Sequence, residues 1–588
     1  MKSLYQHKIN QDNIGEVVTV AGWVSKRRDH GGVIFIDLRI SNNIIQAVFN
    51  PEHKDSFVIA ERLRSEYVVE VSGIVRERSK DNINKNLSSG NVEIAVDKII
   101  LLNESKTPPF SINDLSVNED QRLKYRYMDM RGEQLQKNIR FRSKLIESIR
   151  NFFYSRDFID IETPILTKTT PEGARDYLVP SRVHSGNFFA LPQSPQIFKQ
   201  TLMIGGVDKY FQIARCFRDE DLRADRQPEF TQLDVELAFA DEDIISSLIE
   251  DLFRKIFKDI INEEINNFEK ISYFDALTKY GCDKPDLRNP LVMEDIKKIV
   301  HEVEFKVFSD HISKDDSRIV ALRVPGGNKL SRKEIDELTQ LVISCGAKGL
   351  AYLKCDSVSD YDNGIISPIK KFLGPDVVNN IVKLTKSKNG DIIFFSADKT
   401  NVVNTSMSML IKKLGESLNL IEPAWKFLWV TDYPMFEKIE GSENLTSLHH
   451  PFTSPSHDED LNSDDILNIK SRAYDLVLNG HEIGGGSIRI HNPQTQKKVF
   501  ELLKLTEDEI ESKFGFFIEA LSYGCPPHGG IAFGIDRLAM LLLEVNSIRD
   551  VIAFPKTQSS SCLLTDAPSS ISDLQLDELS LKIENTEE

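Results

Sequence analysis

The sequence predicts a multidomain α+β protein with a small N-terminal β-barrel and a larger domain of mixed helices and strands. Its 588 residues exceed the roughly 250–300 that one hydrophobic core usually holds. Residues 1–105 alternate short β-rich runs with turns, whereas long amphipathic helical patterns begin only after Asp120. Segments able to carry chemistry stop before about residue 286 and resume at Trp429. The block at 286–420 is therefore interpreted as an inserted α+β domain.

Five strands are predicted in the first 105 residues, with turns at Asp29–Gly32 and Ser41–Asn43. A short helix at 58–65 stands between the third and fourth strands. The strands lie at 17–24, 33–40, 43–50, 67–75 and 92–102. Five short strands and one helix in about 100 residues fit a Greek-key barrel of the OB type.

The rest of the chain is divided by composition and helical pattern. SKTPPFSIND has the Pro and Ser content of a hinge, and long helices are predicted at 133–157 and 241–268. The last 32 residues, rich in Ser and acidic residues, are expected to form a largely mobile tail. The predicted domains are 1–105 (barrel), 106–135 (hinge), 136–285 (main domain, first part), 286–420 (insertion), 421–556 (main domain, second part) and 557–588 (tail).

Composition excludes several classes of protein. No apolar run approaches the roughly 18 residues of a membrane span, and the N-terminus lacks the apolar core of a secretory signal. Six cysteines without a CxxC pair suggest reduced cytoplasmic thiols. The net charge of -17 is uneven, because residues 1–100 hold 14 Lys and Arg against 13 Asp and Glu. Binding of a nucleic acid through local basic surfaces therefore stays open.

The first motif is FRDEDLRADRQPEFTQLD at 217–234, an apolar strand that runs into a charged loop and a second strand. Arg218 at the strand end could bind phosphate oxygens bidentately with help from loop arginines. Glu220 could accept a hydrogen bond from an adenine amino group, and Phe230 could stack on the ring. A hairpin with a solvated charged tip is the simpler alternative.

Two further motifs are weaker alone. GGIAFGIDRLAM at 529–540 is a glycine-dotted strand followed by an apolar helix, with Arg537 near the helix start, where anions are favoured. A glycine-rich strand packed on a neighbour would have the same pattern. FIDIETPIL at 158–166 leads from a helix into a strand with Pro164.

In this order the three motifs resemble motifs one, two and three of the class II aminoacyl-tRNA synthetases. The sequence contains no GxxxxGK[ST] loop, HIGH or KMSKS. A barrel ahead of the motifs resembles the subclass of the aspartyl, asparaginyl and lysyl enzymes, and 286–420 resembles the bacterial-type insertion. The resemblance covers essentially the full length. It implies an antiparallel-sheet catalytic domain flanked by helices, a homodimer with Pro164 at its interface, and a cytoplasmic enzyme.

The amino acid is inferred from charge. Lys199 in QSPQIFKQ and Arg489 in GGGSIRIH could bind a side-chain carboxylate, with Asp234 holding Lys199 in place. These segments resemble the aspartyl enzymes, in which the matching positions read aspartate. The same resemblance places further residues around the α-amino group or over the substrate: Glu172, Ser194, Gln196 and His449. Outside this framework, Arg489 could form a structural salt bridge and His449 could be a buried loop histidine.

The resemblance implies a two-step reaction, in which the aspartate α-carboxylate attacks the α-phosphate of ATP and a ribose 3′-OH of tRNA then takes the aspartyl group. Arg218 and Arg537 are the expected catalytic residues, on the α- and γ-phosphates. Adenine is expected between Phe230 and Arg537. The expected ATP-binding residues are Arg218, Asp219, Glu220, Gln227, Phe230, Glu482, Gly534, Ile535, Asp536 and Arg537. Glu482 and Asp475 are plausible Mg²⁺ ligands, since acidic groups beside a triphosphate need a cation; for Asp475 an ordinary carboxylate is the alternative.

The barrel is expected to read the tRNA anticodon. The positions that resemble the family's anticodon-reading set are Arg28, Phe35, Gln46 and Glu93, with Phe35 as a stacking platform. In this family a histidine at the place of His30 accompanies relaxed enzymes that charge both tRNA(Asp) and tRNA(Asn). Asp81, in SKDN, replaces the small glycine associated with such enzymes, so the two positions point in opposite directions.

Two other functions remain open from the sequence. An AMP-forming amide ligase, such as an asparagine synthetase of this fold, would use the same core, but it needs no anticodon-reading barrel. An inactive paralogue that only binds RNA would not need Arg218, Glu220, Arg489 and Arg537 together.

Overall fold

The computed structural model describes residues 9–41, 43–85, 87–114, 116–169, 174–221, 224–439 and 441–584. They form two compact units. The first contains the described residues up to Phe141, Ala224 and Val545–Ser570; the second contains the other described residues between Arg142 and Glu544 and those from Ile571 onward. No helix in these ranges is long and apolar enough to cross a membrane.

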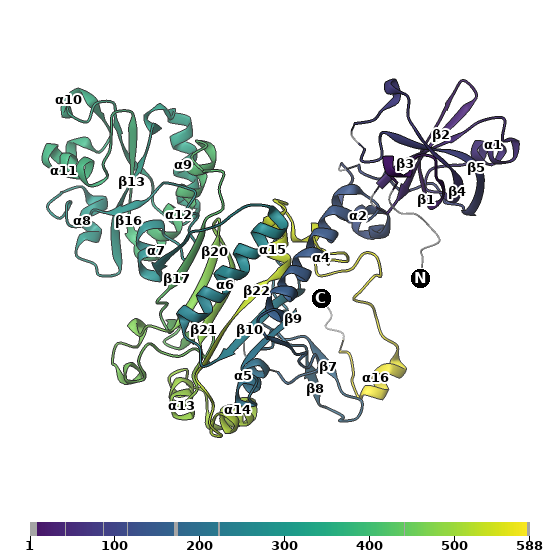
Figure 1. Ribbon diagram of the computed structural model, residues 1–588. Helices are drawn as coiled ribbons and strands as arrows, with labels where there is room; N and C mark the ends of the chain where they lie inside the picture. Colours follow the sequence, from purple (N-terminus) through teal and green to yellow (C-terminus); the bar gives the residue numbers. More distant parts are fainter. Residues whose placement is uncertain are drawn as a thin grey trace. The chain divides into compact units, whose positions relative to one another are not determined.

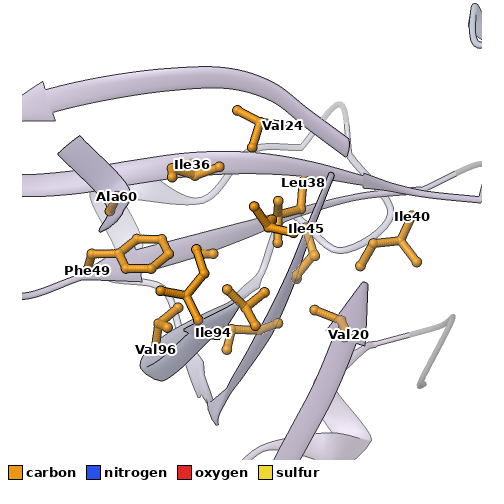
Figure 2. Packing of buried hydrophobic residues seen from close by; sticks show 14 of the residues in the cluster. Val20, Val24, Ile36, Leu38, Ile40, Ile45, Phe49, Ala60, Ile94 and Val96 are labelled. Atoms are coloured by element: carbon orange, nitrogen blue, oxygen red, sulfur yellow. The ribbon is translucent and has the colours of Figure 1, made fainter. Parts of the chain in front are cut away.

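The first unit contains a closed five-stranded barrel with the strand order β1-β2-β3-β5-β4. The strands are β1 (Val17–His30), β2 (Val33–Ile40), β3 (Asn43–Phe49), β4 (Val68–Glu77) and β5 (Val92–Asn103), and α1 (Lys54–Arg62) stands between β3 and β4 in the chain. Every second residue is buried from Val17 to Val24 in β1 and from Val33 to Leu38 in β2. Val20, Ile36, Ile45 and Ile94 meet in the interior (Figure 2). The OB-type barrel predicted from this alternation is confirmed.

The hinge and a late segment of the chain complete the first unit. The hinge holds α2 (Glu119–Lys124) and α3 (Arg126–Asp129), followed by α4 (Glu133–Tyr154), which continues into the second unit. The buried guanidinium of Arg126 donates to the carbonyl oxygens of Arg549, Ile552 and Ala553. These bonds join the hinge to a segment that the sequence boundaries place in the second part of the main domain.

The second unit is built on an eight-stranded sheet. In spatial order the strands are β11 (Phe268–Ser272), β17 (Phe427–Thr431), β20 (Ala473–Leu478), β21 (His481–Ile488), β22 (His528–Gly534), β10 (Glu229–Ala238), β9 (Lys209–Phe217) and β6 (Ile159–Asp160). All neighbours are antiparallel except the two outermost pairs. Helix α6 (Glu242–Ile256) lies across the sheet (Figure 1). It packs there through Phe253, whose ring lies 5.2 Å from that of Phe427 and 5.4 Å from that of Phe533.

Two predicted elements are shorter than expected. The helix predicted at 241–268 ends with a π-turn at Phe257–Ile261, because Asn262 adopts a left-handed conformation (φ 61°) that closes the helix. The strand predicted within 158–166 pairs only over Ile159–Asp160. Pro164 cannot donate a ladder hydrogen bond, so the strand could not continue through it, but the pairing with β9 already ends four residues earlier.

The inserted block has its own antiparallel sheet, with helices on both faces (Figure 1). The strand order is β12 (Met293–Asp295), β13 (Ser317–Val324), β16 (Asp391–Lys399), β14 (Ala351–Cys355) and β15 (Ile365–Ile366). Helices α9 (Arg332–Ser344) and α12 (Thr400–Ser417) cover one core, and α8 (Lys306–Ile312) and α11 (Lys370–Leu384) cover the other. The predicted alternation of helices and strands is therefore present.

The remaining smaller elements are α5 (Gln196–Ile204), α7 (Tyr273–Tyr280), α10 (Tyr361–Gly364), α13 (Pro493–Leu502), α14 (Glu507–Leu521), α15 (Ile535–Leu542), α16 (Asp573–Leu579), and the two-stranded pairs β7 (Leu178–Pro180) with β8 (Phe188–Ala190) and β18 (Phe436–Lys438) with β19 (Leu445–Ser447). They lie beside the large sheet, except α10, which belongs to the inserted block, and α16, which lies in the predicted tail (Figure 1). Helix α16 begins with a capping box between Ser572 and Gln575.

Candidate functional site

The motif-two loop connects β9 to β10, with Arg218 directly after β9. The Arg218 N–H donates to Pro228 O at 2.8 Å, and its guanidinium lies 5.1 Å from the centre of the Phe230 ring. Glu220 is paired with Arg226 at 2.9 Å, and Gln227 is buried. Asp219 forms a bridge with Arg175. Arg223, the other loop arginine, lies outside the described residues.

Motif three places Arg537 on the first turn of α15, after Gly534 has ended β22. Its Nη1 donates to Glu482 O at 3.0 Å, and its Nη2 lies 3.2 Å from Asp225 Oδ2. A carboxylate of the motif-two loop thus holds the expected γ-phosphate ligand. The guanidinium over the Phe230 ring is that of Arg218. The predicted position of adenine between Phe230 and Arg537 therefore requires Arg218 to move away from the ring.

The Asp536 side chain is buried beside motif three. Its Oδ1 accepts from Arg142 Nε at 2.8 Å, and its Oδ2 accepts from the Thr231 N–H at 2.8 Å. Asp536 therefore ties α4, β10 and α15 together. Any contact of this residue with a nucleotide would be made through its backbone, as for Gly534 and Ile535.

Four fully buried charged side chains form one group between α5, β10 and the end of β21. Lys199 Nζ lies 3.1 Å from Asp234 Oδ1 and 3.5 Å from Glu236 Oε2. Arg489 donates to both oxygens of Glu236, at 2.9 and 3.2 Å. A Cβ at Gly530 would lie 2.0 Å from Glu236 Oε2, so only glycine leaves room for this carboxylate.

The group has two positive and two negative formal charges, and burial acts on both carboxyls. Burial raises the pKa of Asp234 despite its bond to Lys199, and Asp234 Oδ2 has no hydrogen-bond partner among the described residues. Burial also opposes ionisation of Glu236, but Arg489 and Lys199 together lower its pKa below the ordinary value. An entering carboxylate would add a negative charge within reach of two cations that are shielded from water.

Two neighbouring histidines lie beside the charged group. His450 Nε2 meets Arg489 Nη1, which also donates to Ser487 Oγ at 2.7 Å. His449 lies 4.7 Å from the Tyr433 ring and 3.7 Å from Asp475 Oδ1. Burial and then Arg489 lower the pKa of His449 to about 4 and that of His450 well below 6.5. Both are therefore neutral near pH 7.

Asp475 and Glu482 are positioned on the antiparallel pair β20 and β21. Asp475 Oδ2 accepts from the Tyr433 hydroxyl at 2.8 Å, whereas Oδ1 has no hydrogen-bond partner among the described residues. A Cβ at Gly485 would lie 2.5 Å from Asp475 Oδ1 and 3.9 Å from Glu482 Oε1. Burial and then Glu482 raise the pKa of Asp475.

This carboxylate pair suits a divalent cation, because oxygen ligands of like charge are stabilised by a shared Mg²⁺. The described residues contain no cluster of three or more His, Cys, Asp or Glu side chains able to hold a metal. The remaining ligands of such a cation would come from water and substrate oxygens.

The predicted α-amino side of the pocket is described in part. Ser194 Oγ accepts from the Gln196 N–H at 3.3 Å at the start of α5. Gln196 Nε2 is buried and makes no hydrogen bond to any described residue. Glu172, the third predicted residue, lies outside the described residues. Gln196 is thus the first residue of the helix that also supplies Lys199, and Ser194 lies just before that helix.

The predicted anticodon residues share a polar network on the barrel. Arg28 is bonded to Asp37 at 2.6 Å and to Gln46 at 3.4 Å, and Gln46 Nε2 donates to Glu93 at 3.0 Å. The half-buried Phe35 lies on β2, with the His30 ring 6.2 Å away in an edge-to-face arrangement. Asp81 lies in the one-turn 3-10 helix Lys80–Asn82, between β4 and β5 in the chain.

Several residues of these sites were missed from the sequence. In the charged group they are Glu236, His450 and Ser487, and on the barrel they are Asp37 and Arg76, which pairs with Glu93 at 2.8 Å. Glu236 follows Asp234 by two residues on a strand, so the two-residue period would have placed both on one face. The other contacts depend on which strands become neighbours.

The fold and the candidate site agree with the protein families whose models match this chain. Residues 118–558 match the family described as tRNA synthetases class II (D, K and N), and residues 18–102 match the OB-fold nucleic acid binding domain. The chain therefore belongs to the class II tRNA synthetases of the D, K and N type.

Within this class, particular proteins are similar over the whole chain. The aspartate–tRNA(Asp/Asn) ligase of Legionella pneumophila (strain Paris) is 53% identical, covering 100% of this chain and 99% of its own. That of Ruthia magnifica is 51% identical, covering 99% of both chains. Among solved structures, the asparaginyl-tRNA synthetase of Pyrococcus horikoshii has a TM-score of 0.57 at 18% identity, covering 95% of this chain and 98% of its own. This structural likeness supports the fold.

Proposed function

We propose that the chain is an aspartate–tRNA ligase, which activates L-aspartate with ATP and transfers it to tRNA. The observation that carries the proposal is the buried cation pair formed by Lys199 on α5 and Arg489 directly after β21. The motif-two and motif-three arginines follow β9 and β22 of the same sheet. An aspartate side chain brings the carboxylate that two such cations bind. A lysine side chain would add a third positive charge. The full-length similarity to aspartate–tRNA(Asp/Asn) ligases supports the same substrate.

The first step forms aspartyl-adenylate. An oxygen of the aspartate α-carboxylate attacks the α-phosphorus of ATP, and the bond to the oxygen shared with the β-phosphate breaks, releasing pyrophosphate. Arg218 stabilises charge on the α-phosphate, and Arg537 exchanges Asp225 for the γ-phosphate. Phe230 stacks on adenine, and Glu220 and Gln227 fix the nucleotide. Asp475 and Glu482 would hold a Mg²⁺ ion, which would supply positive charge to offset that of the phosphates.

The remaining predicted ligands orient the amino acid. Ser194, Gln196 and Glu172 surround the α-amino group, and the unpartnered Gln196 amide is available for that contact. His449 closes over the substrate. Positioning and charge neutralisation do most of the catalytic work, because the reaction needs no covalent enzyme intermediate.

In the second step the 3′-OH of the terminal adenosine of tRNA attacks the aspartyl carbonyl carbon and AMP leaves. The barrel binds the anticodon through Phe35, Arg28, Gln46 and Glu93. We propose that both tRNA(Asp) and tRNA(Asn) are charged. His30 lies beside the stacking platform Phe35, and the similar proteins are named for both tRNAs.

We also propose that the enzyme works as a cytoplasmic homodimer, because tRNA and ATP are cytoplasmic substrates. Around Pro164 the side chains of Ile159, Ile165 and Leu166 are 52%, 42% and 51% exposed. Large apolar side chains gathered on a surface favour a protein interface. Sedimentation at micromolar concentration tests the dimer.

The function is tested by two assays on the purified chain. Aspartate-dependent exchange of pyrophosphate into ATP is expected, followed by charging of transcripts of tRNA(Asp) and tRNA(Asn). Exchange without charging of either tRNA would refute the ligase and favour the amide-forming enzyme. Absence of both exchange and charging would favour a paralogue that only binds RNA. Charging of tRNA(Asp) alone would refute only the dual specificity.

A further inference from the structure

His528, the first residue of β22, lies fully buried behind the aspartate-reading group. It makes contacts on three sides. Its carbonyl oxygen accepts from the Arg489 backbone N–H at 2.9 Å. Its Nδ1 lies 2.8 Å from Pro526 O, and its Nε2 lies 3.2 Å from the side-chain amide of Gln200. Neither His528 nor Gln200 is needed by the chemistry described above.

The protonation of His528 fixes the direction of these bonds. Burial lowers its pKa, although Glu236 acts in the opposite sense, so the ring is neutral near pH 7. A neutral ring that donates from Nδ1 to Pro526 O must accept at Nε2. Gln200 therefore presents its NH₂ group to Nε2, with its amide turned so that the nitrogen takes the place of Oε1. This orientation also gives Gln200 Nε2 the partner that it otherwise lacks among the described residues.

The contacts of His528 join the two supports of the cation pair. Gln200 follows Lys199 on α5, and both are buried. On the other side, His528 holds the backbone of Arg489 itself. Glu236 connects the same cations only through their head groups, and these contacts must loosen when a substrate carboxylate competes for them. The bonds of His528 do not compete with the substrate.

We propose that His528 is a positioning residue for the aspartate side chain: by linking Gln200 on α5 to the backbone of Arg489, it fixes the separation between the Lys199 ammonium and the Arg489 guanidinium. This role rests on the proposed aspartate–tRNA ligase function. It predicts a defect confined to aspartate, because the nucleotide ligands Arg218 and Arg537 stand on other segments.

Two substitutions at His528 separate its contacts. Asparagine (H528N) places an amide near Nδ1, keeping the bond to Pro526 O and losing Gln200. Glutamine (H528Q) extends an amide to the position of Nε2 and keeps the bond to Gln200. Gln200→Met removes the other end of the same link without changing the charge. His311→Asn is the matched control, since His311 is buried in the inserted domain and bonds Ser317 Oγ at 3.2 Å.

The assay is aspartate-dependent ATP–pyrophosphate exchange by the full chain, with separate titrations of aspartate and ATP and a measured Tm for each variant. A displaced binding group about 1 Å from its place costs up to about a hundredfold, and we expect H528N and Q200M each to raise the aspartate KM about tenfold. The ATP KM should stay within about twofold, and H528Q should lie close to wild type. The double variant H528N/Q200M should be no worse than either single variant, because both break one link.

The role of His528 is overturned if aspartate and ATP KM values rise together in H528N, or if H528N, Q200M and wild type share one aspartate KM. Equal defects in H528N and H528Q would also overturn it. Should H528N fail to fold, Q200M carries the same test. Exchange that is absent from the wild-type chain refutes the proposed function itself, whereas a normal wild type with unshifted variants refutes only the link.

Discussion

The substitution Glu236→Gln tests the charge balance of the aspartate pocket. Glu236 is fully buried and binds Arg489 through both oxygens and Lys199 through one. With glutamine, the two cations keep only Asp234 as an acidic partner, and the buried group carries one net positive charge. Breaking a buried pair by removing one partner costs about 3–5 kcal/mol. At about 3 °C per kcal/mol for a domain of this size, Tm should fall by about 10 °C.

Aspartate should reverse part of this loss. In the wild-type protein, the substrate side-chain carboxylate adds a negative charge to a group that is already neutral. In Glu236→Gln the same carboxylate neutralises the excess positive charge. Saturating aspartate should therefore raise the Tm of the variant by several degrees more than that of wild type.

Differential scanning calorimetry of both proteins, with and without aspartate, measures both effects. Glu269→Gln is the control, because Glu269 is an exposed carboxylate on the edge strand β11, and it should leave both values unchanged. The reasoning is refuted if the unliganded variant unfolds at the wild-type temperature, or if aspartate stabilises the two proteins equally.

Three further predictions concern separate parts of the chain. Phe35→Ala should lower kcat/KM for tRNA charging about 5- to 150-fold, the worth of one stacked base, and leave ATP–pyrophosphate exchange unchanged; equal losses in both assays would contradict the anticodon role. The pKa of His449 is about 4 in the folded protein and about 6.5 in the unfolded chain. Its contribution to the free energy of unfolding is therefore fully present above pH 6.5, and about 3 kcal/mol of it is lost as the pH falls to 4. Urea unfolding should show a smaller acid loss in His449→Gln, and an unchanged loss would disprove this. Asp475→Asn should raise the Mg²⁺ concentration for half-maximal exchange about tenfold. It should not lower Tm, because it removes a buried like charge beside Glu482. An unchanged Mg²⁺ requirement would argue against the cation site.

The sequence predicted elements whose stability is local and missed contacts that depend on distant neighbours. The barrel strands alternate apolar and polar residues, and this period survives in the structure because one face of each strand is buried. The end of α6 was misplaced because Asn262 closes the helix through a left-handed conformation, which an asparagine permits but does not require. The early end of β6 at Asp160 likewise follows from its pairing with β9.

The candidate site shows the same division. The basic residues Lys199, Arg218, Arg489 and Arg537 were identified from motifs and spacing, and their roles remain proposals. Asp234 was predicted as the partner of Lys199, and the two are in contact. The partners of Arg489 and Arg537 were not predicted, since Asp225 reaches Arg537 from the motif-two loop across 312 residues of sequence. The two neighbouring histidines His449 and His450 are a similar case, because the sequence does not indicate that the imidazole of His450 faces Arg489.

The paired state of the site bears on its selectivity. Three of the four basic residues expected to meet a substrate anion already have an acidic partner within the protein: Asp225 for Arg537, Asp234 for Lys199 and Glu236 for Arg489. A substrate must therefore offer more than these partners do. Asparagine, which is neutral at its side chain, has no charge with which to compete for a guanidinium bound to a buried carboxylate. Aspartate does, and in a water-excluded group the difference between a charged and a neutral ligand is larger than at the surface. Under the proposed function, the protein carboxylates are competitors that only an anionic side chain can match, and we therefore expect Glu236 to help reject asparagine as well as to hold Arg489.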